Sequence, residues 1–210
     1  MLFTKPTKLL FVGDSITDCG RDYQANGLDL GTGYVAQVQA LLSAHHPDAQ
    51  MCILNTGISG NRVTDLELRW DTDVLAHQPD WVVLMIGIND VWRHFDNPRM
   101  EQVTLEAYSA KLERLIQRTL PEVKGMIVMS PFFLESNLKD PMREMMDHYG
   151  TASREIAERL GQRFVDVQAA FDMWLAHNES TQLCDDRVHP NAIGHTIIAS
   201  AFLNAVGFNW

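Results

Sequence analysis

Five short apolar segments alternate with longer stretches of helical periodicity, and this alternation restricts the possible folds more than any other feature of the chain. The apolar segments are residues 8–12, 51–55, 81–86, 126–130 and 163–166. They are rich in Val, Ile, Leu and Met, and polar residues do not alternate with apolar ones along them. Parallel strands that are covered on both faces have this composition. We therefore expect five buried, parallel strands.

Most of the intervals between these segments carry helical patterns. In residues 34–45, 101–119, 142–160 and 192–205, apolar side chains recur at spacings of three and four, as on the buried face of an amphipathic helix. A further helix is expected to begin at Thr64, which forms a capping-box pattern with Glu67. Repeated strand–helix alternation is typical of an α/β protein with right-handed crossovers. We expect a three-layer α/β/α sandwich in a single domain, residues 1–210.

Four polar blocks lie at the ends of these predicted elements. Three directly follow apolar segments, and the fourth directly precedes the last helical pattern. The blocks are Gly13-Asp14-Ser15, Gly57-Ile58-Ser59-Gly60-Asn61, Gly87-Ile88-Asn89-Asp90 and Asp186-Arg187-Val188-His189-Pro190. Open parallel sheets bind ligands at the carboxyl ends of their strands. We therefore expect Ser15, Gly60 and Asn89 to meet at one edge of the sheet.

Ser15, His189 and Asp186 have the character of a catalytic triad. A serine hydroxyl becomes a useful nucleophile when a base accepts its proton. Asp186 precedes His189 by three residues on one irregular turn, so its carboxylate can orient the imidazole through Nδ1 and leave Nε2 for the serine. Gly60, Asn89 and the Ser15 amide are the candidate oxyanion donors, because glycine lets a backbone N–H approach closely and asparagine supplies a side-chain amide. Together these groups predict acyl transfer.

Each block also has an alternative interpretation. Ser15 could be a turn residue that caps a short helix, and Asn89 could belong to an ordinary Asn-Asp turn. The pattern Gly13-Asp14-x-x-x-Asp18 matches a metal-binding motif of haloacid-dehalogenase-type phosphatases, but that fold needs an upstream Asp-x-Asp strand, and no aspartate precedes this pattern. Asp185 and the last block could also form a metal site, although we expect no metal to be involved.

Composition argues against several classes of partner. The chain has 27 Asp and Glu against 17 Lys and Arg, and the resulting net charge of −10 is spread along the sequence. This charge disfavours binding to nucleic acid or to an anionic membrane surface. The first residues lack the layout of a signal peptide, and no apolar run approaches about 20 residues. With Cys19, Cys52 and Cys184 expected as free buried thiols, we expect a cytoplasmic protein.

The chain resembles the SGNH hydrolases of the GDSL esterase superfamily over nearly its whole length. The four family letters fall on Ser15, Gly60, Asn89 and His189, with Asp186 as the third member of the triad. The first family block often ends in Leu, whereas Ile16 stands there in this chain. Longer stretches, at residues 10–21, 31–36, 86–93, 140–143 and 186–190, are similar to those of intracellular acetylxylan esterases.

This resemblance implies a flavodoxin-like sandwich and a cofactor-free serine esterase. Its substrate would be an acetylated xylo-oligosaccharide or a similar acetylated sugar, from which the acetyl groups are removed through an acyl-enzyme. Fold alone would not give a substrate. An esterase or thioesterase that acts on another small acyl compound is one alternative, and a carbohydrate-binding protein with a vestigial site is another.

Aromatic residues are expected around the site and at the end of the chain. Trp92 follows Asn89 by three residues, and Phe132 and Phe133 follow the fourth strand. We expect Trp92 and Phe132 to bind substrate, since bulky rings would leave room for little more than an acetyl methyl group and aromatic faces suit sugar rings. The alternative is that these rings pack within the loops. The aromatic tail, residues 206–210, either folds back on the core or enters a subunit interface, and we expect a homo-oligomer.

Overall fold

One parallel sheet forms the centre of the molecule. The computed structural model describes residues 2–3 and 6–210. The strands are β1 (Thr7–Gly13), β2 (Met51–Asn55), β3 (Trp81–Met85), β4 (Gly125–Met129) and β5 (Arg163–Val165). Every neighbouring pair is parallel, and the strand order is β2-β1-β3-β4-β5. The five predicted strands are therefore confirmed, with bounds that differ from the expected ones by no more than one residue at either end.

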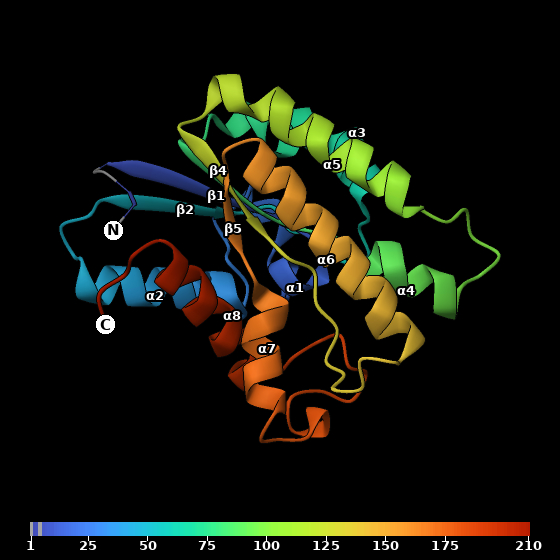
Figure 1. Ribbon diagram of the computed structural model, residues 1–210. Helices are drawn as coiled ribbons and strands as arrows, with labels where there is room; N and C mark the ends of the chain where they lie inside the picture. The colour runs from blue at the N-terminus through green and yellow to red at the C-terminus, as the bar shows by residue number, and fades with distance from the viewer. Residues whose placement is uncertain (1, 4–5) are drawn as a thin grey trace.

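Helices cover both faces of this sheet (Figure 1). On one face α3 (Val63–Asp73), α5 (Leu105–Thr119) and α6 (Pro141–Arg159) pack beside one another, and on the other α2 (Tyr34–His45) packs against α8 (Ala192–Ala205), which also contacts α7 (Val167–Leu175). Two further helices, α1 (Ser15–Asp18) and α4 (Ile88–Asp96), directly follow β1 and β3. Short 3₁₀ helices lie at Tyr23–Ala25, Leu75–His77, Leu120–Glu122 and Ser180–Gln182. The expected three-layer α/β/α sandwich is confirmed.

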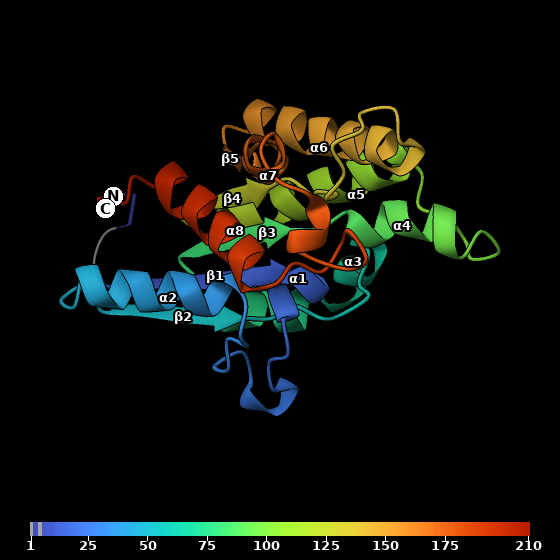
Figure 2. The ribbon, with the colours of Figure 1, turned by 90° about the horizontal axis from the view of Figure 1, so that it is seen from below.

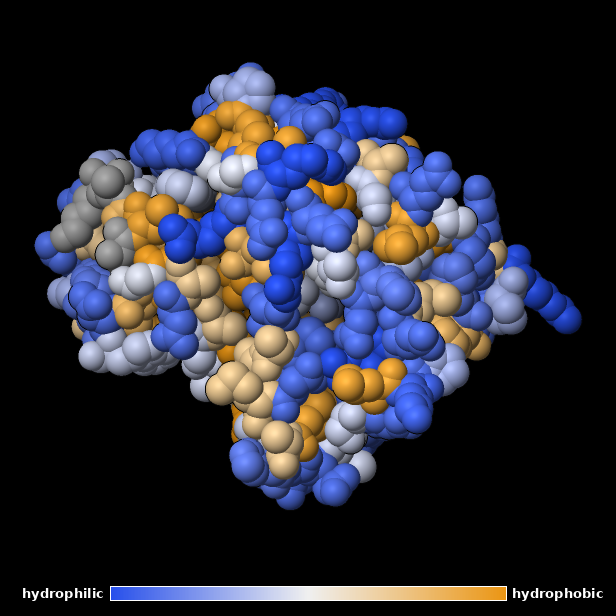
Figure 3. Space-filling view, in the orientation of Figure 1, coloured by the Kyte–Doolittle hydropathy of each residue, from blue (hydrophilic) through white to orange (hydrophobic). Residues whose placement is uncertain are grey.

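The two helical layers explain why the strands are apolar along their whole length. In β1 the consecutive residues Leu9, Leu10, Phe11 and Val12 are all fully buried, although their side chains point alternately to opposite faces. Apolar side chains on the outer surface form separate small patches among hydrophilic residues on the face that Figure 3 shows. No helix among residues 2–3 and 6–210 combines the length and the apolar character that crossing a bilayer requires.

The helix bounds differ from the sequence expectation in several places. Helix α3 begins at Val63, because Arg62 is its N-cap and the Asp65 carboxylate accepts a 2.8 Å hydrogen bond from the Arg62 N–H. The capping box expected at Thr64 is therefore wrong, and the Thr64 hydroxyl is buried with no hydrogen-bond partner among the described residues. Helix α5 begins only at Leu105, where the hydroxyl of Thr104 accepts from the backbone of the first turn.

All three cysteines of the chain are free. Cys19 and Cys184 are half-buried, but Cys52 is exposed, so the expectation of buried thiols is wrong for Cys52. It lies in β2, the edge strand of the sheet, where one side has no neighbouring strand to cover it.

The sheet has a topological switch point between β1 and β3. The chain leaves β1 toward β2 at one edge and leaves β3 toward β4 on the opposite side. The connections therefore diverge, and ligands bind in the crevice that such a divergence leaves at the carboxyl ends of the strands. Ser15 follows β1 directly and Asn89 lies in the first turn of the helix after β3, so both lie at this point. Figure 2 shows the segment between α7 and α8 beside α1 and the beginning of α4.

Candidate active site

Ser15 is the first residue of α1, immediately after β1. Asp14 is the N-cap of this short helix, and its Oδ1 accepts a 3.0 Å hydrogen bond from the Ile16 N–H. Burial raises the pKa of the Asp14 carboxyl to about 7, against the effect of the Ile16 hydrogen bond, and the nearby Asp90 raises it further. The turn from strand to helix places the Ser15 hydroxyl at the carboxyl edge of the sheet.

Three side chains that are distant in sequence form a continuous hydrogen-bonded chain here. Ser15 Oγ lies 2.8 Å from His189 Nε2, and His189 Nδ1 lies 2.6 Å from Asp186 Oδ2. The other oxygen of Asp186 accepts from the backbone N–H groups of Val188 and His189, at 2.9 and 2.8 Å. These two bonds fix the carboxylate within its own turn. The structure thus brings together the three residues that the sequence predicts as a triad.

The ionisation of Asp186 determines the direction of these hydrogen bonds. Partial burial raises the pKa of its carboxyl, but the hydrogen bonds from the His189 backbone and ring and from the Val188 N–H outweigh burial and hold this pKa below its ordinary value of 3.8. A carboxylate only accepts hydrogen bonds, so Nδ1–H of His189 donates to it. In a neutral imidazole Nε2 is then the acceptor, and the Ser15 hydroxyl donates to it. This is the arrangement in which histidine can remove the serine proton.

The turn that carries Asp186 and His189 is held by the loop after β4. Its second residue, Arg187, has φ of +62°, a left-handed conformation that a side chain disfavours. The carbonyl of Arg187 accepts a 3.0 Å hydrogen bond from Leu134 N–H, and its guanidinium contacts Glu135 at 2.7 Å and Asp140 at 3.3 Å. These contacts offset the strained backbone and fix the turn.

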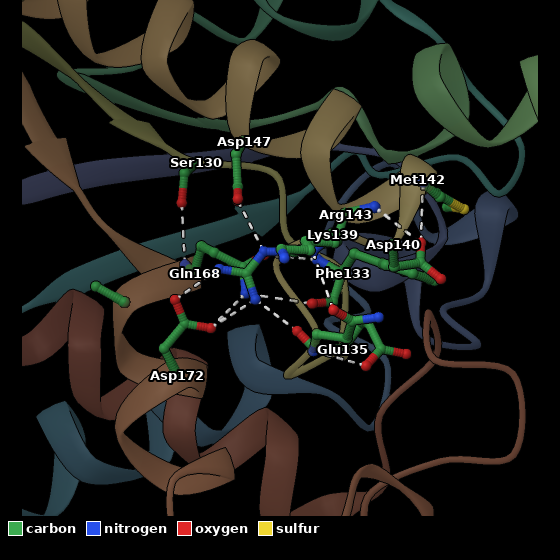
Figure 4. Close-up of polar contacts among 12 residues, drawn as sticks. Ser130, Phe133, Glu135, Lys139, Asp140, Met142, Arg143, Asp147, Gln168 and Asp172 are labelled. Carbon is green, nitrogen blue, oxygen red and sulfur yellow. Dashed lines mark hydrogen bonds and ion pairs between the residues drawn. The ribbon is translucent and has the colours of Figure 1, made fainter.

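The loop after β4 is itself fixed by a buried arginine. Figure 4 shows the Arg143 guanidinium between Asp147 and Asp172 and close to Glu135. Arg143 is 3% exposed, pairs with both oxygens of Asp172 at 2.9 and 2.7 Å, and donates to Asp147 at 2.8 Å and to the Glu135 carbonyl at 2.5 Å. A bidentate arginine pair of this kind imposes a defined geometry. The network therefore extends from α6 and α7 through the Glu135 segment to Arg187.

Gly60 and Asn89 lie on the loop after β2 and on α4. Gly60 has φ of +83°, and a Cβ at this position would meet no other atom within 4 Å. Glycine is therefore required here for its left-handed backbone and not for tight packing. Asn89 Nδ2 donates a 3.0 Å hydrogen bond to the Asn61 carbonyl, and Arg93 donates to its Oδ1 at 3.2 Å. Because an amide nitrogen has two N–H groups, the second one can serve an oxyanion.

Comparison with known proteins agrees with this geometry. Residues 11–197 match the GDSL-like Lipase/Acylhydrolase family, a span that begins in β1 and ends in α8. The chain belongs to the GDSL-like lipase/acylhydrolase family. The predicted membership in the GDSL esterase superfamily is confirmed, and the chain is a carboxylic ester hydrolase.

This GDSL-like hydrolase is similar to known proteins along nearly its whole length, as three matches show. The acetylxylan esterase of Geobacillus stearothermophilus is 51% identical over 208 residues, which are 97% of this chain and 95% of that protein. The crystal structure of Axe2, an acetylxylan esterase from the same organism, matches with a TM-score of 0.97 at 50% identity and covers 100% of this chain and 98% of that one. LAE5, described as an alpha/beta hydrolase from the metagenome of Lake Arreo, Spain, has a TM-score of 0.97, 49% identity and coverage of 99% and 98%.

The two aromatic residues predicted to bind substrate have different surroundings. Trp92 lies beside the triad of the GDSL-like hydrolase, with its ring centroid 5.8 Å from that of His189. The ring of Phe132 is not open to a substrate, because it is 2% exposed and packs on Phe171 with centroids 4.5 Å apart. The prediction that Phe132 binds substrate is therefore wrong. Phe133 is buried too, and its ring lies under the guanidinium of Arg187, so it supports the triad turn from below.

Some residues that shape this site were not found from the sequence. Asp18 is 3% exposed, and its Oδ2 accepts hydrogen bonds from the Ser59 hydroxyl at 2.5 Å and the Ser59 N–H at 3.1 Å. It thereby fixes the residue that precedes Gly60. Asn61 and Arg69 support the same loop. Asp18 lies three residues after the first polar block, in the pattern Gly13-Asp14-x-x-x-Asp18, and this closeness to Ser15 was a usable signal. Nothing near Arg69 in the sequence indicates its contacts.

His195 is the second histidine near the triad, and its role is structural. Burial lowers its pKa to about 4, and the charge of His189 lowers it further. Its Nδ1 accepts a 3.1 Å hydrogen bond from the Tyr34 N–H, and its Nε2 lies 3.3 Å from Cys19 Sγ. It therefore joins α8 to α2 and to the end of α1 as a neutral ring.

The described residues contain no group of three or more His, Cys, Asp or Glu side chains arranged to hold a metal ion. The alternative metal site at Asp185, Asp186 and His189 is therefore absent from this part of the chain. Asp186 and His189 are instead hydrogen-bonded to each other, in the manner of a serine hydrolase.

Proposed function

We propose that this protein is a serine esterase that removes acetyl groups from acetylated xylo-oligosaccharides. The observation that carries the proposal is the hydrogen-bonded series Ser15 Oγ–His189 Nε2–Nδ1–Asp186 Oδ2, with spacings of 2.8 and 2.6 Å. It lies in a chain that is 51% identical to an acetylxylan esterase over nearly its whole length. The side chains of His189 and Asp186 are 45% and 40% exposed, so the site is shallow and open to a substrate larger than a simple ester.

In the acylation step, Ser15 Oγ attacks the acetyl carbonyl carbon while its proton moves to His189 Nε2. The carbonyl oxygen becomes an oxyanion that the N–H groups of Ser15 and Gly60 and the Asn89 amide stabilise. The C–O bond to the sugar then breaks, and the proton on Nε2 moves to the leaving sugar oxygen. The ionised Asp186 stabilises the imidazolium that exists between these two proton transfers.

In the deacylation step, a water molecule takes the place of the sugar. His189 Nε2 removes one proton from this water as its oxygen attacks the acetyl carbon bound to Ser15 Oγ. The same three donors stabilise the second oxyanion. When the bond to Oγ breaks, the proton returns from Nε2 to Ser15, and acetate leaves. One water is consumed for each acetic acid and each free sugar hydroxyl formed, and the acid then releases its proton to the solvent as acetate.

The substrate can be tested by a screen of acetate release. Acetylated xylo-oligosaccharides, other acetylated sugars and aryl esters of acetate, butyrate and octanoate are compared by kcat/KM, with Ser15→Ala as the blank. We expect the acetylated xylo-oligosaccharides to be the best sugar substrates. We also expect kcat/KM on aryl esters to fall at least about tenfold from acetate to butyrate, since each clashing methylene costs about 1–3 kcal/mol. Equal or better rates on octanoate would favour a lipase or thioesterase.

As part of this proposal the enzyme acts in the cytoplasm, on neutral oligosaccharides and as a homo-oligomer. Three free thiols suit a reducing compartment, and a net charge of −10 disfavours nucleic acid and anionic membranes as partners. Fractionation of the native source, with the esterase activity followed in each fraction, tests the location.

A further inference from the structure

A hollow of about 260 Å³ is lined by Trp92, the aromatic neighbour of His189, and the chemistry of acyl transfer does not use it. It is formed by the end of α4, the beginning of α6 and the turn before α8. Figure 1 shows α4 and the beginning of α6 on one side of the molecule. The residues that matter for its chemistry are Trp92, Phe95, Asp96, Asp140, Met142 and Arg187. All of them lie on helices or at their ends, except Arg187, which the Glu135 contact holds in place.

Trp92 connects the hollow to the histidine, while no residue of the triad and neither Gly60 nor Asn89 lines it. Trp92 lines it, and the ring of this residue lies 5.8 Å from the ring of His189 between centroids. Arg187 lines it too, and this residue lies in the chain between Asp186 and His189. Gly60 and Asn89, which face the developing oxyanion, do not line it.

This position has a chemical consequence. In acylation the proton carried by His189 Nε2 must reach the oxygen that leaves with the sugar. The sugar must therefore lie on the histidine side of Ser15, while the carbonyl oxygen points toward Gly60 and Asn89. Trp92, which lines the hollow, is the aromatic neighbour of His189 on that side.

The lining suits a pyranose ring. Phe95 is 43% exposed although it is a large apolar side chain, and together with Trp92 and Met142 it offers apolar surface to the C–H faces of a sugar. Asp96, Asp140 and Arg187 surround this surface. Asp96 pairs with Arg93 and Asp140 with Arg187, and each carboxylate has further acceptor sites for a hydroxyl. The volume lies just below the roughly 300–1,000 Å³ of pockets that bind drug-sized ligands, which fits one sugar ring and not a chain of them.

We propose that this hollow is a subsite for the sugar part of the substrate, with Phe95 as its aromatic platform. The proposal rests on the proposed function, because it takes the leaving group to be a sugar. It makes Phe95 a determinant of specificity for the alcohol part of the substrate, while the triad acts on the acetyl part.

The test compares Phe95→Ala with the wild type on two acetate esters. One is an acetylated xylo-oligosaccharide, and the other is ethyl acetate, whose leaving group is too small to fill the hollow. We expect the ratio of kcat/KM on the sugar ester to kcat/KM on ethyl acetate to fall about tenfold in Phe95→Ala, mainly through KM, since the loss of one aromatic contact changes affinity by about that factor. Phe95→Tyr keeps the platform and should restore the ratio.

Xylobiose without acetyl groups allows a second measurement, because its binding can be followed without hydrolysis of a sugar ester. As an inhibitor of ethyl acetate hydrolysis, it should bind about tenfold more weakly to Phe95→Ala than to the wild type. Leu68→Ala is the matched control, because Leu68 is 87% exposed on α3, away from the hollow, and this variant should match the wild type in both measurements. Circular dichroism establishes that each variant is folded.

The outcomes separate the two proposals. If the wild type hydrolyses ethyl acetate but not acetylated xylo-oligosaccharides, the proposed function is wrong. If it hydrolyses both and Phe95→Ala changes neither the ratio nor the inhibition by xylobiose, the subsite is wrong and the function stands. If Phe95→Ala instead lowers the molecular mass in solution and leaves the ratio unchanged, the hollow is covered by a second copy of the chain, which also overturns the subsite.

Discussion

Nε of Arg69 donates a 2.7 Å hydrogen bond to Oδ1 of Asn61, the residue whose carbonyl accepts from the Asn89 amide at 3.0 Å. The same guanidinium donates to the carbonyl of Thr56 at 2.7 Å and to that of Gly13 at 3.0 Å. One arginine on α3 therefore connects the end of β1, the end of β2 and the candidate oxyanion amide. Asp73 balances its charge at 2.9 Å.

Replacing Arg69 by Lys should lower kcat about tenfold and leave KM nearly unchanged. A lysine has a single nitrogen and cannot reproduce the fork of donors, so Asn61 would no longer hold the Asn89 amide in the position that the transition state needs. The free energy of unfolding should fall by at least about 3 kcal/mol, because at least two of the four hydrogen bonds are lost and each one from a charged donor contributes about 1.5–3 kcal/mol. Steady-state kinetics and urea unfolding measure the two effects. Arg114→Lys, at a residue whose side chain is 66% exposed, is the control, and an unchanged kcat in Arg69→Lys would remove Arg69 from this role.

Replacing Ser15 by Ala should abolish ester hydrolysis without unfolding the protein. Loss of the nucleophile in serine hydrolases lowers kcat by about 10⁴–10⁶. Ser15 is only partly buried, so the loss of its hydroxyl should leave the fold intact. His189→Ala should have the same effect, and Asp186→Ala a smaller one, because the carboxylate orients the ring and does not react. Rates of acetate release and the melting temperature are measured for each variant. A Ser15→Ala enzyme within about tenfold of the wild type would exclude Ser15 as the nucleophile.

Replacing Asn89 by Ala should lower kcat about 10²–10³-fold with a smaller effect on KM. The amide is expected to bind the oxyanion of the transition state and not the carbonyl of the ground state. Asn97→Ala is a control on the same segment, since Asn97 is the C-cap of α4 and contributes backbone groups there. A change confined to KM would show that Asn89 binds substrate and does not stabilise the oxyanion.

The strands and the triad could be predicted from the sequence because their signals are local. A strand covered on both faces appears in the sequence as a continuous apolar run. The nucleophile, the glycine and the asparagine each lie in the segment that follows such a run. Helices α4 and α7 were not predicted, because the local sequence at the beginning of each helix favours another kind of element. Asn89 and Asp90 resemble a turn, and the apolar segment at 163–166 leads directly into α7 with only the Asp166 cap between them.

The errors concern residues whose position depends on distant contacts. Phe132 follows β4 as a substrate-binding ring could, but Phe171 on α7 provides the surface that buries it. Arg69 is 56 residues from Gly13 and still donates a hydrogen bond to it. A single sequence gives no sign of such pairings, so the support of the oxyanion loop could be found only in the folded chain.

The aromatic tail folds back on the chain at Phe208, and a substitution at Trp210 tests whether its end enters a subunit interface. Phe208 folds back and is 5% exposed against His45 and His46, whereas Trp210 is 61% exposed and is held by a 2.5 Å hydrogen bond to Asn204. We expect Trp210 to contact a second subunit, so Trp210→Ala should lower the mass measured by light scattering, while Trp210→Phe should lower it less. If the wild type and both variants have the mass of one chain, Trp210 has no role in assembly.

Replacing Asp14 by Asn should change how stability depends on pH. Burial raises the pKa of Asp14 from 3.8 to about 7 in the folded protein. Between these values the unfolded chain loses a proton that the folded protein keeps, so this group's contribution to stability is complete below about pH 4 and is lost as the pH rises through about 7. Asparagine caps a helix as well as aspartate does and carries no titrating proton. The difference in the free energy of unfolding between variant and wild type should therefore shift in favour of Asp14→Asn from about pH 4.5 to about pH 8.

Urea unfolding at these two pH values measures that difference, and an exposed aspartate supplies the control. A hydrogen bond from Arg118 holds the pKa of Asp71 below its ordinary value, so Asp71 titrates below the range of the experiment and its own contribution is lost only as the pH falls through that lower pKa. Asp71→Asn should therefore differ from the wild type by the same amount at both pH values. If Asp14→Asn behaves like Asp71→Asn, then Asp14 is ionised across the whole range, and a charged carboxylate is buried next to the nucleophile.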